Sequence, residues 1–132
     1  MMPLLPVIAA GLVPFIVGSM WYHPKILGST WMRMKHITPD MAERSSRLLL
    51  HSTAIMIVVG ILSSFMLSHV LYALEVATVL HATLLAFGLW LGFVIPSSIN
   101  RVLWDHAPLT LYAIETGQWL VSFIIMAIVL TI

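Results

Sequence analysis

Long apolar stretches alternate with shorter polar segments along this chain. Four stretches are apolar over the roughly 20 residues that a helix needs to cross a hydrocarbon core about 30 Å thick. They lie at about residues 4–22, 48–70, 77–99 and 109–131. The pattern predicts an all-α protein, a four-helix transmembrane bundle that forms a single integral membrane domain over residues 1–132.

Helix starts and packing faces follow from single residues within this pattern. Thr38 followed by Pro39 is typical of a helix start, and predicts a helix that begins near Pro39 and continues into the second apolar stretch. In the third stretch, Gly88 and Gly92 form a GxxxG pair. Because small residues let helices approach closely, we expect these two glycines to form a close helix contact.

The basic residues are divided unequally between the connections. All six Lys and Arg residues lie in the polar connections 23–47 and 100–108, and none lies in the turn between the second and third stretches. Short cytoplasmic loops are enriched in Lys and Arg. We therefore expect these two connections to be cytoplasmic and both termini to be extracytoplasmic, in a multi-pass protein of the cell (inner or plasma) membrane.

The composition agrees with this interpretation and excludes other classes. The chain is 61% hydrophobic and 8% charged, and its mean hydropathy of +1.04 lies outside the range of soluble domains. A net charge of +1 gives no basis for nucleic-acid binding. The absence of cysteine excludes disulfides, thiolate metal sites and cysteine nucleophiles.

Two motifs resemble those of a known family. The run GSMWYHPKILGSTWMR (residues 18–33) and the run GLWLGFVIPSSINRVLW (residues 88–104) are similar to the two characteristic stretches of the Domain of Unknown Function 1761 family. The resemblance extends over essentially the whole chain. It implies a small integral membrane protein with four spans, and it implies no particular activity.

One carboxylate lies well inside an apolar stretch. Glu115 shares a helix face with Gln118, so both are predicted to point into the bundle. A carboxylate within the membrane is costly, and is by default a functional candidate. The alternative is a structural role, with the protonated group bonded to a partner such as His51 or Asn100.

His81 is the second candidate, because it lies on the same face as the two glycines of the third stretch. We expect it to point into the bundle, either hydrogen-bonded within the protein or, with Glu115 and Gln118, as part of a proton or solute path. The remaining histidines match no metal-binding spacing, so no metal ligand and no cofactor are predicted.

Aromatic and charged residues of the two polar connections are expected to form one cytoplasmic patch. Two interpretations stay open: anchoring of the helices at the lipid headgroups, and docking of a partner protein. The candidate patch comprises Trp21, Tyr22, His23, Pro24, Gly28, Trp31, Arg101, Trp104 and Asp105.

No nucleophile elbow, zinc-protease motif or P-loop occurs in the sequence. The leading hypothesis is a non-enzymatic protein that acts by self-association or as a small accessory subunit, with membrane lipid and other membrane subunits as partners. One alternative is a small oligomeric channel or proton-linked transporter that uses Glu115 and His81. A second alternative is a haem- or metal-binding membrane enzyme.

Overall fold

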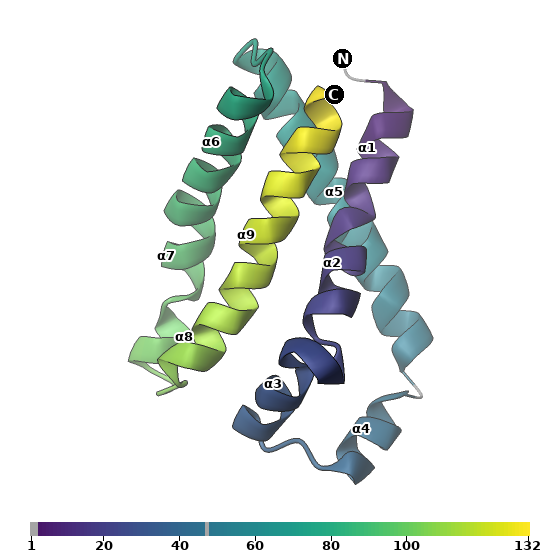
Figure 1. Cartoon of the computed structure of the whole chain (residues 1–132), viewed down its shortest axis with the longest axis vertical. Helices are drawn as coiled ribbons and strands as arrows, with labels where there is room; N and C mark the ends of the chain where they lie inside the picture. The colour runs from purple at the N-terminus through teal and green to yellow at the C-terminus, as the bar shows by residue number, and fades with distance from the viewer. Residues whose placement is uncertain (1–2, 47) are drawn as a thin grey trace.

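A computed structural model describes residues 3–46 and 48–132, and these residues contain helices and no strand (Figure 1). Four helical segments are long and apolar enough to cross a membrane, which confirms the predicted fold class. They are Leu4–Trp21, Leu49–Ala73, Val79–Leu103 and Leu109–Thr131. The elements, in order, are α1 (Leu4–Gly11), α2 (Val13–Trp21), η1 (Pro24–Gly28), α3 (Ser29–Met34), α4 (Pro39–Ser46), α5 (Leu49–Ala73), α6 (Val79–Leu89), η2 (Trp90–Val94), α7 (Ile95–Ser98), α8 (Asn100–Leu103) and α9 (Leu109–Thr131).

Two of these elements, η1 and η2, are single π-helical turns next to prolines. In η2 the N–H of Ile95 donates to the carbonyl of Trp90, five residues earlier. Pro96 follows directly and has no N–H to donate, so the regular α-helical ladder is interrupted here. The third span (Val79–Leu103) is therefore a chain of short helical pieces rather than one uninterrupted α-helix.

The helix predicted to run from Pro39 into the membrane is in fact two helices. α4 ends at Ser46 and α5 begins at Leu49, while Arg47 lies outside the described residues. The N–H of Leu48 bonds to the carbonyl of Ser45, three residues earlier, as in a turn and not four residues earlier as in an α-helix.

α9 lies at the centre of the arrangement. It packs against α6 on one side and against α1 and α2 on the other, while α5 packs mainly on α1 (Figure 1). Over the described residues, α5 and α6 are not packed closely against each other, although they follow one another in the chain. The four spans thus form an open bundle rather than a closed ring.

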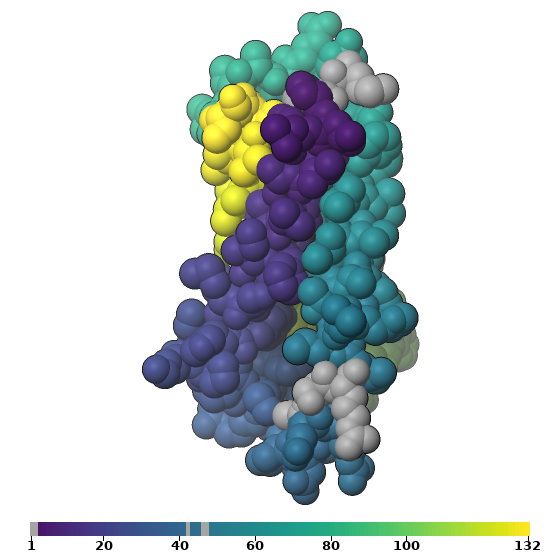
Figure 2. Space-filling view, turned by 90° about the vertical axis from the view of Figure 1, so that its right-hand side faces the viewer, coloured from purple at the N-terminus to yellow at the C-terminus, as the bar shows by residue number. Residues whose placement is uncertain are grey.

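One glycine from each of the first two spans brings their backbones into contact. A Cβ built on Gly60 would lie 2.1 Å from the carbonyl oxygen of Gly11, and one on Gly11 would lie 2.6 Å from the Cα of Ile61. Beside this contact the hydroxyl of Ser64 donates to the carbonyl of Val7 at 2.8 Å. Figure 2 shows α1 lying directly along α5. Backbone contact therefore holds the first two spans together.

The two ends of the molecule differ in charge. Both termini and the turn after α5 lie at one end, whereas α3, α4 and α8 lie at the other (Figure 1). The Lys and Arg residues within the described part of the chain belong to the second end: Lys25, Arg33, Lys35, Arg44 and Arg101. The side of the membrane that each end faces stays a prediction.

Candidate functional site

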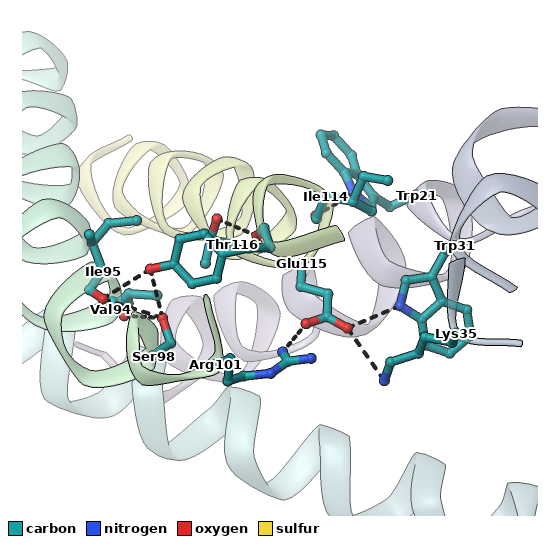
Figure 3. A network of polar contacts seen from close by, with 11 residues as sticks. Trp21, Trp31, Lys35, Val94, Ile95, Ser98, Arg101, Ile114, Glu115 and Thr116 are labelled. Carbon is teal, nitrogen blue, oxygen red and sulfur yellow. Dashed lines mark hydrogen bonds and ion pairs between the residues drawn. The ribbon is translucent and has the colours of Figure 1, made fainter. Parts of the chain in front are cut away.

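Glu115 lies at the centre of a charged cluster at the basic end of the molecule. Its carboxylate forms an ion pair with the guanidinium of Arg101, and its Oε1 lies 3.4 Å from the Nζ of Lys35. The indole Nε1–H of Trp31 donates to the same oxygen at 3.1 Å. Figure 3 shows Trp31 and Lys35 reaching the carboxylate from one side and Arg101 from the other.

This arrangement corrects the predicted partners of Glu115. His51 and Asn100, proposed as partners of a protonated carboxyl group, are both exposed. Two basic side chains take their place, and the Glu115 side chain keeps 15% of its surface exposed. Attraction to the two cations offsets part of the cost of burying the carboxylate.

Two helix ends bring the basic side chains to Glu115. Lys35 follows α3, and the next residue, His36, has a φ of 55°, so that the N–H of Ile37 bonds to the carbonyl of Met32. His106 also has a φ of 55°, in the turn that leads from α8 back to α9. Left-handed residues of this kind end helices, so these two histidines have a structural explanation.

Indole and phenol groups hold α9 in position around the cluster. The Nε1–H of Trp21 donates to the carbonyl of Ile114 at 2.9 Å, and that of Trp90 donates to the carbonyl of Thr116 at 2.8 Å. The two indoles belong to the first and third spans, so the carbonyls on either side of Glu115 are fixed by two different helices. Tyr112 donates to the carbonyl of Ile95 at 2.9 Å, which adds a second bond to the third span.

The predicted aromatic patch forms only in part. The rings of Tyr22 and Trp31 pack with centroids 5.2 Å apart beside Arg101. Burial raises the pKa of the Tyr22 phenol above its ordinary value, although the positive charge of Arg101 opposes this rise. Four members of the patch lie exposed: His23, Pro24, Trp104 and Asp105. Gly28 is buried in the turn, where a Cβ would lie 2.1 Å from the carbonyl oxygen of Tyr22.

The prediction that His81 points into the bundle is wrong. His81 is exposed in the first turn of α6, where its N–H and its Nδ1 both bond to the hydroxyl of Thr78. Thr78 is the N-cap of α6, so His81 takes part in capping the helix. The residues that face α9 at this level are Ala82 and Ala86.

Gly88 and Gly92 make no close contact with the part of the chain that the structure describes, contrary to the expected close helix contact. A Cβ built on either glycine would meet nothing within 4 Å among the described residues. Both lie on the outward face of the third span. A close contact with another chain stays a prediction.

Gln118 is buried, on the inward face as expected. Its side-chain N–H groups donate to the carbonyl of Pro14 and to the hydroxyl of Ser122, both at 3.1 Å. Ser122 in turn donates to the carbonyl of Gln118. This polar group links α9 to the first span at the position where a proline begins the second half of that span.

A groove of about 1400 Å³ opens between α5 and the third span, with α9 as its floor. Its walls are mainly apolar, and Tyr22, Trp31, Arg101 and Glu115 also line it. The apolar lining includes Leu62, Met66, Leu89, Phe93, Trp119 and Phe123. Within the described ranges there is no group of three or more His, Asp or Glu side chains arranged to hold a metal ion.

Sequence reasoning missed Lys35 in the cluster and Gly11 and Gly60 in the helix contact. Lys35 precedes Glu115 by 80 residues, and no periodic pattern relates them. Gly11 and Gly60 are isolated glycines in different spans, so neither shows a GxxxG spacing. A usable signal was the excess of basic residues at one membrane face, since a carboxylate inside the span near that face, such as Glu115, requires a cation.

Comparison with known proteins agrees with the resemblance seen in the two motifs. No curated protein and no solved structure matches the chain. A family model matches residues 5–131, which is nearly the whole sequence. The chain therefore belongs to the family described as "Protein of unknown function (DUF1761)".

Proposed function

We propose that this protein is a non-catalytic component of the cell membrane that works by self-association, through the outward face of its third span. One observation carries the proposal. In an 18-residue apolar stretch of the third span only 11% of the residues are buried within the chain, compared with 28% to 39% in such stretches of the other three. A span with so little contact inside its own chain has most of its surface available to lipid or to another protein.

The outward face of this span is shaped for close helix packing. Gly88 and Gly92 lie one helical turn apart, and the space beside both is open among the residues described. Leu84 and Leu91 are exposed on the same span. Small residues let two backbones approach, and the neighbouring apolar side chains add contact area. Association with a different membrane protein, as an accessory subunit, is the alternative occupant of this face.

The polar groups inside the chain support a structural role over a catalytic one. Glu115 is held by two cations and one indole, and the amide N–H groups of Gln118 are bonded to fixed acceptors. The alternative of a transport path from Glu115 to His81 has less support, because His81 faces away from the bundle.

The test is Gly88→Leu, with oligomer mass measured by native mass spectrometry and by cross-linking in membranes. We expect the wild type to form an oligomer and the variant to lose it, because the leucine side chain separates backbones that otherwise touch. Ala54→Leu is the matched control, since it adds similar bulk at an exposed position of α5.

Both variants should stay as stable as the wild-type monomer, because neither position is packed against other parts of the chain. A wild-type protein that is monomeric in membranes would contradict the proposal. So would an oligomer that survives Gly88→Leu unchanged.

A further inference from the structure

We propose that the groove between α5 and the third span binds one acidic phospholipid from the surrounding bilayer. Its anionic headgroup would lie against Lys35 and Arg101, and its acyl chains along the apolar walls. This site goes beyond the proposed self-association and uses other residues, because neither Gly88 nor Gly92 lines the groove.

The groove has the size of a lipid. Its volume of about 1400 Å³ exceeds the roughly 300–1,000 Å³ of pockets that hold small organic ligands. Along the third span its lining runs from Leu89 to Arg101. Twelve residues of helix correspond to about 18 Å, which is close to the depth of one leaflet, half of a core about 30 Å thick.

The polar end of the groove carries an excess of positive charge. Lys35 and Arg101 contribute two cations, and Glu115 contributes one carboxylate, so the cluster has a net charge of +1 (2 − 1). The side chains of Lys35 and Arg101 remain 35% and 40% exposed. Their other N–H groups can therefore donate to a phosphate, and basic pockets between spans are known to hold acidic headgroups.

The position of this end matches the position of a headgroup. Glu115 lies two turns into the last span, at the end of the molecule that holds the basic residues, and the apolar lining extends from there toward the termini. Tyr22 and Trp31 line the same end, and Tyr and Trp are the residues enriched at headgroup level.

A second copy of the chain is a poorer occupant. Copies inserted in the same orientation carry their cationic clusters at the same depth, so a symmetric contact through this groove would bring like charges together. A zwitterionic phospholipid brings its own cation toward Lys35 and Arg101. An anionic headgroup meets neither penalty.

The experiment measures lipid retention by native mass spectrometry, with phosphatidylglycerol and phosphatidylcholine of identical acyl chains added to the delipidated protein. We expect one phosphatidylglycerol per chain and much weaker retention of phosphatidylcholine. Oleate is added separately, and weaker binding than phosphatidylglycerol is expected, because a single chain fills less of the groove.

Charge variants then test the headgroup site. Lys35→Gln should weaken phosphatidylglycerol binding about fivefold, the effect expected for one basic residue near a lipid headgroup. Lys25→Gln is the matched control, because Lys25 also lies exposed at the same end, whereas Lys35 pairs with Glu115, a residue of the groove lining. Glu115→Gln removes the only carboxylate of the cluster and should strengthen binding. Circular dichroism confirms that each variant is folded.

A bulk variant tests the acyl-chain site. Ser63→Trp narrows the groove and should weaken binding, whereas Ala54→Trp adds the same ring on α5 away from the lining and should leave it unchanged. Gly88→Leu should also leave lipid binding unchanged, which separates this inference from the proposed self-association.

Several results would overturn the inference. These are equal retention of the two phospholipids, equal effects of Lys35→Gln and Lys25→Gln, and undiminished binding to Ser63→Trp, which would place the lipid on the outer surface. A dimer that excludes the lipid from the groove would assign the groove to a second copy.

Discussion

Replacing Gly60 by alanine should separate the first two spans. The added Cβ would lie 2.1 Å from the carbonyl oxygen of Gly11, whereas real Cβ contacts essentially never fall below 3.0 Å. The two backbones must therefore move apart by at least 0.9 Å (3.0 − 2.1). The bond from Ser64 to the carbonyl of Val7, now 2.8 Å, cannot survive a shift of that size along its own direction.

The expected cost follows from three contributions. Overpacking at a rigid backbone contact costs about 1–3 kcal/mol, and loss of one hydrogen bond between spans adds about 0.6 kcal/mol. Alanine is favoured over glycine in a helix by about 1 kcal/mol, which partly offsets the loss. Together these contributions lower the free energy of unfolding by about 0.6–2.6 kcal/mol.

Unfolding of the detergent-solubilised monomer in increasing dodecyl sulfate measures this difference. Gly88→Ala is the control, because its Cβ meets nothing within 4 Å among the described residues, and it should gain up to about 1 kcal/mol from helix propensity alone. Ser64→Ala should lose only the hydrogen-bond contribution, about 0.6 kcal/mol. The reasoning would be refuted if Gly60→Ala were as stable as wild type or if the two glycine variants behaved alike.

Two further predictions concern the orientation of the chain and the support of α9. A cysteine at Ala77 should react with an impermeant thiol reagent outside intact cells and one at Ser29 should not, as the six-to-none distribution of basic residues requires; the reverse labelling would show an inverted topology. Trp90→Phe removes the bond to the carbonyl of Thr116 and should lower the free energy of unfolding by about 0.6 kcal/mol. Trp104→Phe, at an exposed position, should leave it unchanged, and equal effects of the two would contradict the assigned bond.

The number and lengths of the spans could be predicted from the sequence, because hydrocarbon thickness alone determines how many apolar residues a span needs. Which face of the third span packs against the other helices could not be predicted from the sequence. The glycine pair indicated a close-packing face, but alanine is also small, and it is Ala82 and Ala86 that face α9. His81 shares a helix face with the two glycines, and because that face points outward, His81 points outward as well.

The residues that contact Glu115 could not be predicted from the sequence either. A buried carboxylate requires a cation or a proton, and that requirement could be stated in advance. Which cation meets it depends on where the chain reverses after α3 and after α8. Those reversals rest on left-handed His36 and His106, a conformation uncommon for residues other than glycine, so no local pattern pointed to Lys35.

The π-helical turn η2 inserts one extra residue into the helical register of the third span. Each residue of an α-helix advances the side-chain direction by about 100°, so everything after Val94 is rotated by roughly that angle from where an uninterrupted helix would place it. On an uninterrupted helix, Ala82, Ala86, Ser98 and Arg101 would spread over about 160°. The extra residue turns Ser98 and Arg101 back toward the side on which Ala82 and Ala86 face α9. The two parts of the span therefore have different helical registers, and this change of register brings the guanidinium of Arg101 to Glu115.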